Sequence, residues 1–358
     1  MPHCLISFGA NIGQPAETIQ QAVQLLRTHL QDRLCQLSIS RFFRTPAVGG
    51  PAAQPPFINA VAALELEDCS AWDMWHVVRK IEQQLGRVRV ERWEARRIDL
   101  DVLLFDDQRI WTQHFKLPHP RLVMRRFILE PALDVASDWV EPVSRLSLSA
   151  LAQRLRQGSA SITLVARDMA QGQLLLERAA RKSQSRWLAP GLVKDALASN
   201  SLDSGSGLES CLPNSTYGAA AASVTDRWQG PDRWLGLIAE TYLESHSDRA
   251  SDDGTNPIDK RVELVPPAKL VVLLASPLAA AGAAWEDYHR DRAQWLGLCP
   301  RSPSMPVPTN VPSSLGQLVW PLAGPRYLLS TDDLAWSEHE IVAALEAMDC
   351  PVEAISGF

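Results

Sequence analysis

Apolar residues in the first part of the chain change repeatedly between the spacing of a strand and that of a helix. Short β-rich runs predict strands at 3–9, 37–45, 57–66 and 98–105. A helical period predicts helices at 15–30 and 70–85, and Ser70 followed by Asp73 forms a capping-box pattern at the start of the second. The resulting order, βαββαβ, is typical of ferredoxin-like α+β domains.

The second half of the chain has a looser pattern. Short helices are predicted at 146–158 and 171–182, and six serines between Ser199 and Ser215 indicate a flexible linker. Beyond it, strands at 269–275 and 327–330 and helices at 278–296 and 337–348 suggest a small α/β unit. We therefore expect a first domain at 1–165, a largely flexible linker at 166–227 and a small domain at 228–358.

Composition and charge exclude several classes of protein. The 358 residues are 46% hydrophobic and 21% charged, which suits two folded domains rather than a disordered chain. A net charge of −6 argues against a nucleic-acid partner. Six scattered cysteines without a CxxC spacing favour a reduced, cytoplasmic protein over a disulfide framework or a zinc site. Neither a signal peptide nor a membrane-spanning run is found, so we expect no membrane partner.

The strongest chemical signal is GRVRVERWEARRIDLDVLL at 86–104. Its five arginines and two glutamates give a local charge of +3. Asp99 and Asp101 follow on a strand whose other face is predicted to be Ile98, Leu100, Val102 and Leu104. A carboxylate pair suits Mg²⁺ with substrate phosphates as further ligands, and arginines bind phosphate oxygens. Together these groups are typical of phosphoryl transfer.

A structural interpretation of the same residues stays open at this point. The arginines and acids could form a salt-bridged surface loop, and Asp99 and Asp101 could be the solvated face of an edge strand. Two further stretches favour a binding site. FRTPAVGGPAAQPPFINAV displays Phe57 and Asn59, an aromatic ring and an amide suited to a heterocycle, and LPHPRLVMRRFILEP adds His119, Arg121, Arg125 and Phe127.

Five segments of the chain occur in the order found in a known family. SFGANIG, SRFFRTPAVGG, PPFINAV, GRVRVERWEARRIDLDVLLFDD and LPHPRLVMRRFILEP resemble those of the 6-hydroxymethyl-7,8-dihydropterin pyrophosphokinases, over about residues 1–145. The resemblance implies an enzyme of folate biosynthesis that transfers diphosphate from ATP to a hydroxymethyl-dihydropterin. It also implies ATP as co-substrate and two Mg²⁺ ions as cofactors.

The resemblance further implies a role for each matching residue. Asp99 and Asp101 would hold the two metal ions. The groups that contact the phosphates or clamp the transition state would be Arg87, Arg89, Arg96, His119 and Arg125. The groups in or beside the nucleotide site would be Glu82, Arg92 and Trp93. The pterin would be bound by Thr45, Pro46, Val48, Phe57, Asn59 and Phe127, with the two phenylalanines on either side of its ring.

The sequence departs from the family at a few positions. Glu94 and Ala95 replace the usual Gly and Pro of the tryptophan loop, and Phe57 stands where a tyrosine is common. The changed loop leaves a second hypothesis open, a degenerate pterin- or nucleotide-binding regulator without turnover.

The C-terminal half faintly resembles deoxynucleoside-kinase-like P-loop proteins, but the chain has no GxxxxGK[ST] motif. We expect this half to be non-catalytic, with self-association or a protein partner as its possible role. Asp332 and Asp333 are interpreted as helix-capping acids rather than metal ligands.

Overall fold

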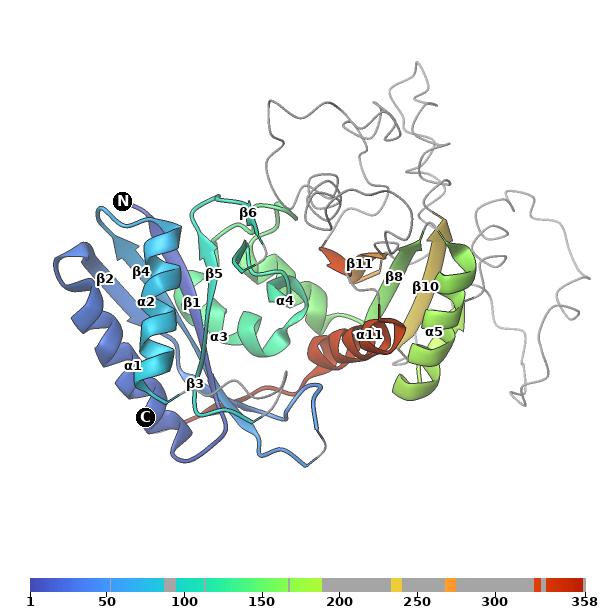
Figure 1. The fold of residues 1–358 in the computed structure, drawn as a ribbon, viewed down its shortest axis with the longest axis horizontal. Helices are drawn as coiled ribbons and strands as arrows, with labels where there is room; N and C mark the ends of the chain where they lie inside the picture. Colours follow the sequence, from blue (N-terminus) through green and yellow to red (C-terminus); the bar gives the residue numbers. More distant parts are fainter. Residues whose placement is uncertain are drawn as a thin grey trace, which may run out of the picture.

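The computed structural model describes residues 1–51, 53–86, 95–112, 114–166, 168–188, 233–239, 268–274, 325–329 and 333–356. Three features expected from the sequence lie outside these ranges: most of the arginine-rich loop (87–94), the serine-rich linker and the helix at 278–296. The protein has an α+β fold built on two main sheets, drawn at the left and right of Figure 1.

The first sheet is antiparallel in all its pairings. Its order is β13-β3-β4-β1-β5, and β2 also pairs with β4. The strands are β1 (His3–Ala10), β2 (Leu34–Ile39), β3 (Phe42–Thr45), β4 (Phe57–Leu66), β5 (Asp99–Phe105) and β13 (Glu353–Ile355).

The single strand expected at 37–45 is instead the pair β2 and β3. The side chain of Ser40 accepts a hydrogen bond from Val61 N–H at 3.0 Å, a position that a backbone carbonyl takes in a regular ladder. This side-chain bond interrupts the ladder between the two strands.

Helices α1 (Pro15–Leu30) and α2 (Ala71–Gln84) cover one face of this sheet (Figure 1). Their apolar residues, among them Ile19, Leu26 and Ile81, share a cluster with the β1, β4 and β5 side chains that point the same way. The predicted capping box is confirmed, since Ser70 Oγ accepts from Asp73 N–H and Asp73 accepts from Ser70 N–H.

Strand β5 departs from the expected alternation near its end. Its register against β1 shifts, because Leu5 pairs with Leu104 while Ile6 pairs with Val102. Leu103 is therefore the extra residue of a β-bulge, and Leu104 faces the opposite side from Leu100 and Val102. The expected common face of Ile98, Leu100, Val102 and Leu104 is thus wrong for Leu104.

The other face of the first sheet carries α3 (Arg126–Ala136), and α4 (Leu148–Arg156) packs on α3. Short elements connect the main ones. The segment η1 (Gln31–Arg33) joins α1 to β2, and the β6–β7 hairpin (Ile110–Trp111 and Lys116–Leu117) and η2 (Leu122–Met124) lead from β5 to α3. Residues of α3 and α4 join a single apolar cluster that runs from Leu5 and Val61 of the first sheet to Leu175 and Leu345 of the C-terminal part.

The second sheet is parallel, with the order β12-β11-β8-β10-β9. Its strands are β8 (Ser161–Ala166), β9 (Arg186–Leu188), β10 (Trp234–Ala239), β11 (Leu270–Leu274) and β12 (Arg326–Leu329). Helices α5 (Met169–Ser183) and α11 (Leu334–Asp349) accompany it. Asp333 is confirmed as a cap, since its side chain accepts from the N–H groups of Ala335 and Trp336.

The division of the chain differs from the one expected. The expected boundaries put β8 in the first domain and α5 and β9 in the linker, yet all three belong with the second sheet. The run Ser161–Ala166 is buried at every position, as in strands covered on both faces, so it gives no alternating signal. The last strand of the chain also joins the first sheet, because β13 pairs with β3 and places the C-terminus beside that sheet (Figure 1).

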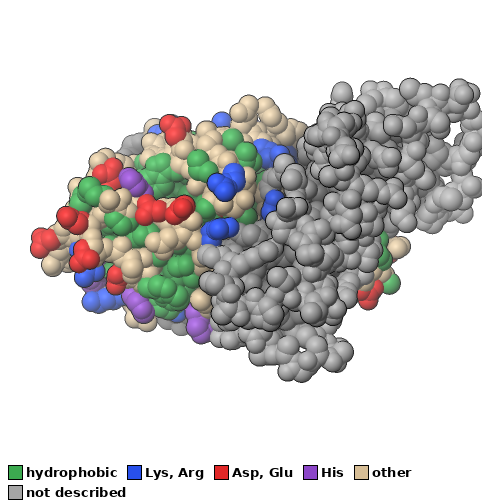
Figure 2. Space-filling view, turned by 90° about the horizontal axis from the view of Figure 1, so that it is seen from above, with side chains coloured by type: hydrophobic (Ala, Val, Ile, Leu, Met, Phe, Trp, Pro, Cys, Tyr) green, Lys and Arg blue, Asp and Glu red, His purple; other side chains and the backbone are tan. Residues whose placement is uncertain are grey.

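The surface seen in Figure 2 mixes side chains of all kinds. Lys and Arg side chains lie in small groups among acidic and apolar ones, without a continuous basic area in the coloured part of this view. Within the described ranges, no helix is long and apolar enough to cross a membrane.

Candidate active site

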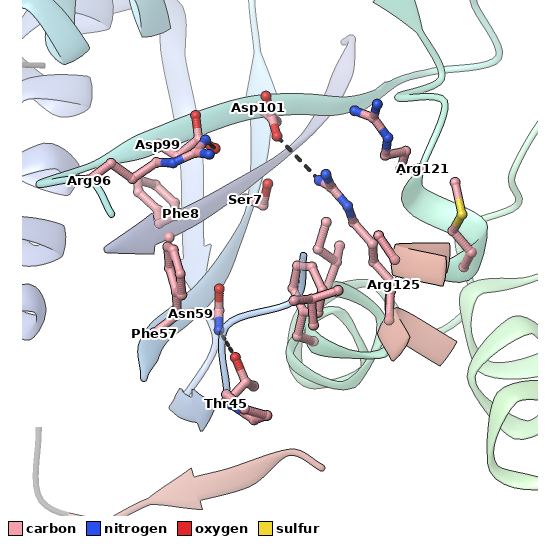
Figure 3. Close-up of a pocket in the computed structure, with 18 of the residues that line it drawn as sticks. Ser7, Phe8, Thr45, Phe57, Asn59, Arg96, Asp99, Asp101, Arg121 and Arg125 are labelled. Atoms are coloured by element: carbon pink, nitrogen blue, oxygen red, sulfur yellow. Dashed lines mark hydrogen bonds and ion pairs between the residues drawn. The ribbon is translucent and has the colours of Figure 1, made fainter. Parts of the chain in front are cut away.

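One pocket lies where β1, β4 and β5 of the first sheet face α3 and α11 (Figure 3). It holds about 930 Å³ of empty space, its open mouth included, which is large enough for a small-molecule ligand. Ten of the residues singled out in the sequence line it: Thr45, Pro46, Val48, Phe57, Asn59, Arg96, Asp99, Asp101, Arg125 and Phe127. Positions 45 to 127 are thus brought together around one space.

The two aspartates are paired with cations in this pocket. Asp99 accepts a hydrogen bond from the Arg96 guanidinium, and Asp101 Oδ2 lies 3.6 Å from Arg125 Nη1 (Figure 3). Asp99 and Asp101 are both partly exposed, and they lie two positions apart on β5, so they share one face of the strand. The structural interpretation is met in part, since β5 is an edge strand of the first sheet and Arg96 pairs with Asp99, but all three residues also line the pocket.

His119 lies directly beside this acidic pair. Its Nε2 is 3.6 Å from Asp101 Oδ2, and its Nδ1 accepts a hydrogen bond from Arg121 N–H at 3.2 Å. The bond to Nδ1 assigns the proton of a neutral ring to Nε2, on the side of Asp101. Burial lowers the pKa of His119 well below its usual value, and the neighbouring Arg125 and Arg121 lower it further. His119 is therefore a neutral hydrogen-bond donor near Asp101.

Two partly buried arginines complete the polar wall. Burial, and then the charge of Arg121, lowers the pKa of Arg125 to about 10. Burial by itself would also lower the pKa of Arg121. The electrostatic interactions with Tyr327 and Glu340 have the larger effect, and the pKa of Arg121 is raised. Arg96, Arg121 and Arg125 thus face Asp99, Asp101 and Glu340, three cations against three carboxylates.

The donor set of this wall fits a magnesium ion that shares its ligands with a substrate. Asp99 and Asp101 offer oxygen ligands, and Mg²⁺ is commonly held by one or two carboxylates plus phosphates. Among the described residues, no group of three or more His, Cys, Asp and Glu could hold a metal. Further ligands would therefore have to come from a bound phosphate and water.

The opposite end of the pocket has a different chemistry. Asn59 is buried, and its Nδ2 donates a hydrogen bond to Thr45 Oγ1 at 2.8 Å (Figure 3). A Cβ on Gly9, the β1 residue paired with Asn59, would lie 3.4 Å from Asn59 Oδ1 and would cover it. Phe57, two positions along β4, points to the same side, so an amide edge and an aromatic ring share this end.

Phe127 lies at the first turn of α3 and also lines the pocket. The Arg125 guanidinium lies over its ring at 5.5 Å from the centroid, which links the aromatic part of the wall to the cationic part. Phe57 and Phe127 thus come from different elements, β4 and α3, as two walls of one space.

Several predicted residues lie elsewhere. Glu82 does not line the pocket: it is buried behind β5, and its Oε1 accepts a hydrogen bond from Leu100 N–H at 2.9 Å. This bond holds the strand between the two aspartates. Arg87, Arg89, Arg92, Trp93 and Glu94 lie outside the described residues.

The sequence analysis missed part of the pocket wall. Arg121 was noted without a role, and Ser7 and Gly9 were quoted only within the SFGANIG segment. A glycine at the end of a predicted strand could have suggested a close approach of a ligand. The contribution of α11 (Glu340, Ala343, Ala344 and Ala347) has no sequence signal, because only the fold brings it to the pocket.

Comparison with known proteins extends these observations. A family model described as 7,8-dihydro-6-hydroxymethylpterin-pyrophosphokinase (HPPK) matches residues 5–137. The 2-amino-4-hydroxy-6-hydroxymethyldihydropteridine pyrophosphokinase of Haemophilus influenzae is 34% identical over 145 residues, which cover 39% of this chain and 86% of the relative. The protein of the same name from Pseudomonas aeruginosa is 36% identical over 140 residues, with 39% and 84% covered.

A solved structure is also similar. The crystal structure of Plasmodium falciparum HPPK-DHPS A437G with STZ-DHP matches with a TM-score of 0.32 and 11% identity. The match covers 50% of this chain and 53% of that chain, so it spans about half the length of the solved protein.

Proposed function

The chain belongs to the 7,8-dihydro-6-hydroxymethylpterin-pyrophosphokinase family, and on that premise we propose that it transfers the β,γ-diphosphate of ATP to 6-hydroxymethyl-7,8-dihydropterin. The hydroxymethyl oxygen forms a bond to the β-phosphorus, the bond from that phosphorus to the α,β-bridging oxygen breaks, and the hydroxyl proton is released. The products are AMP and the dihydropterin methyl diphosphate, as in folate biosynthesis. The observation that carries the proposal is a single pocket with carboxylates and arginines at one end and an amide and aromatic rings at the other.

The polar end suits the triphosphate. Asp99 and Asp101 would hold Mg²⁺, two ions by family resemblance, and the metal neutralises phosphate charge when it is bound. A metal ion bound there would replace Arg96 as the partner of Asp99, and Arg125 as the partner of Asp101. Both guanidinium groups could then donate to phosphate oxygens. Neutral His119 would donate a hydrogen bond from Nε2. A protonated His119 would instead add to the positive charge of its arginine neighbours.

The amide end suits the pterin. Asn59 keeps one N–H on Thr45, so its other N–H and its oxygen are the groups it can offer to the edge of a heterocycle. Phe57 and Phe127 would contact the two faces of the ring, and the backbone at Thr45, Pro46 and Val48 would line its side. Arg87, Arg89, Arg92, Trp93 and Glu82 retain the roles that the family implies as proposals, with Glu82 acting from behind β5.

The finer assignments of fold and organisation also belong to this proposal. The order β1-α1-β2/β3-β4-α2-β5 and the strand order β3-β4-β1-β5 support a ferredoxin-like first domain. We place its boundary with the second sheet between α4 and β8, at about residue 158. A cytoplasmic location, and self-association or a protein partner through the C-terminal part, stay predictions from the sequence.

The product formed from ATP tests the proposal. The full chain, Mg²⁺, ATP and hydroxymethyl-dihydropterin should give AMP and the pterin diphosphate in equal amounts, measured by chromatography, and no product without the metal. ADP as the product would show transfer of a single phosphoryl group and overturn the reaction. Pterin and ATP binding without any product would favour the alternative, a regulator that kept the pocket and lost turnover, for which the replacement of Gly and Pro by Glu94 and Ala95 is the motivating observation.

A further inference from the structure

Helix α11 closes one side of the pocket, although it belongs to the C-terminal part of the chain. Glu340, Ala343, Ala344 and Ala347 line the space, and their spacing of three, four and seven positions places them on one face of the helix. We infer that α11 is a structural part of the pterin pocket, that its alanines set the size of the accepted substrate, and that Glu340 is a positioning residue for Arg121. This inference rests on the proposed function.

A partly buried ion pair links the two parts. Arg121 Nε donates to Glu340 Oε2 at 3.1 Å across 219 residues of sequence, and Arg121 Nη2 donates to Glu340 Oε1. Tyr327 donates its hydroxyl to the same carboxylate at 3.2 Å. Glu340 is only 4% exposed. Two parallel hydrogen bonds from an arginine to a carboxylate set the orientation of the guanidinium and balance its charge. The C-terminal part therefore determines where Arg121 points.

The same helix holds the loop that follows β3. Glu346 Oε2 accepts a hydrogen bond from Gly49 N–H at 3.2 Å, and His339 Nε2 accepts from Gly50 N–H at 3.4 Å. Both glycines have positive φ, 67° and 73°, so this part of the loop takes a conformation that other residues rarely adopt. The loop begins at Thr45, the partner of Asn59, and carries Pro46 and Val48 of the pocket wall.

The end of the chain anchors the arrangement. After α11, β13 pairs with β3 through Glu353–Arg44, Ala354–Phe43 and Ile355–Phe42, next to the start of the same loop. On another face of α11, Ile341, Leu345 and Met348 lie in the apolar cluster that both sheets share, and α11 packs against α5 of the second sheet. Arg178 of α5 donates to Glu338 at 2.7 Å. The helix is therefore held by the second sheet while one of its faces forms the pocket wall.

The alanines leave room that larger residues would fill. Ala343 and Ala347 line the pocket and belong to neither apolar cluster, so a leucine at either position would extend toward the substrate space. Ala335, at the exposed start of the same helix, offers a control for the helix itself. Glu338 offers a control for Glu340, because its carboxylate pairs with Arg178 and Lys182 of α5 rather than with a pocket residue.

The test uses the full chain and measures pterin and ATP separately. Calorimetry with hydroxymethyl-dihydropterin should show Kd raised about tenfold or more for Ala343→Leu and Ala347→Leu, with the Kd of ATP within about twofold of the wild type. Glu340→Gln should raise the Kd for pterin about tenfold, whereas Ala335→Leu and Glu338→Gln should leave it within about twofold. Thermal melts establish that each variant is folded.

Two results would overturn the inference. One is an unchanged pterin Kd in folded Ala343→Leu and Ala347→Leu. The other is a loss of affinity in Glu340→Gln and in Glu338→Gln that is the same for pterin and for ATP. Should the leucine variants not fold, the pair Glu340→Gln and Glu338→Gln decides alone. Failure of the proposed function is a separate result: the wild-type chain would then bind no pterin and make no AMP.

Discussion

Asn11 and Arg96 are joined by two hydrogen bonds across 85 residues of sequence. The Asn11 N–H donates to Arg96 O at 3.1 Å, and the Arg96 N–H donates to Asn11 Oδ1 at 2.7 Å. The side-chain Nδ2 of Asn11 also donates to Pro55 O at 3.1 Å. Buried Asn11 therefore ties the end of β1 to the segments that enter β4 and β5, and it fixes the backbone that carries Arg96 toward Asp99.

Replacing Asn11 should therefore loosen both the fold and the site. Asn11→Ala leaves the Arg96 N–H and the Pro55 carbonyl without their side-chain partner, so the free energy of unfolding should fall by about 1–3 kcal/mol in urea titrations. Asn11→Asp keeps an acceptor for Arg96 and should lose less. A stability and turnover of Asn11→Ala equal to those of the wild type would show that the clamp has no role.

The metal assignment predicts a large loss of turnover. Asp99→Asn and Asp101→Asn each remove one charged ligand from the pair, so turnover measured as AMP formation should fall by roughly a thousandfold or more. Both side chains are partly exposed and face away from Leu100 and Val102, so the melting temperature should change little. Asp106→Asn, a change at a surface aspartate that accepts a hydrogen bond from His3 N–H, is the matched control and should keep full turnover.

A variant of Asp99 or Asp101 with activity near that of the wild type would exclude the residue as a ligand. Dependence on the metal gives a second measurement. A variant that has lost one of two ligands should need a higher Mg²⁺ concentration for half its maximal rate, whereas a variant with only a folding defect should keep the wild-type concentration.

Most strands of the first sheet, and the candidate residues of the site, could be predicted from the sequence because both depend on short segments. Alternation and caps lie within each element, and the DxD pair lies on a single strand. Ten of the proposed site residues line one pocket, where the fold brings together segments that the sequence shows separately. The bulge at Leu103 could not be predicted, because it depends on the register between β1 and β5 rather than on the pattern of β5 alone.

Contacts between distant segments explain what the sequence could not supply. Glu82 is a charged residue on an otherwise apolar helix face, and its role appears only through Leu100 N–H on β5. Similarly, the pairing of Arg121 with Glu340 needs the whole C-terminal sheet to bring α11 into place. The spacing of apolar residues within one element carries no information on pairs of residues from distant elements.

The amide of Asn59 leads to a prediction on substrate selectivity. Asn59→Ala removes the group that would pair with the pterin edge and leaves Thr45 Oγ1 without its donor. The Kd for hydroxymethyl-dihydropterin should rise by about 10- to 100-fold, since a buried heterocycle edge would lose its partner. The Kd for ATP should stay within a factor of about two, as no phosphate contact changes. Equal losses for both ligands in calorimetry would contradict the role of Asn59.

The last prediction concerns a chain that ends near Ser185, which would fold and stay active if the C-terminal half had no part in the site or in the core. In the structure this cut leaves β8, buried at every position, without its neighbours β10 and β11. It also removes α11 from the pocket wall and β13 from the first sheet. We expect mostly insoluble protein, or a melting temperature lower by about 10 °C or more. A chain ending at Gln157 removes β8 as well and should be more soluble, because that buried strand is no longer left without its neighbours. A soluble chain ending at Ser185 that melts and binds pterin like the full chain would show that α11 is dispensable.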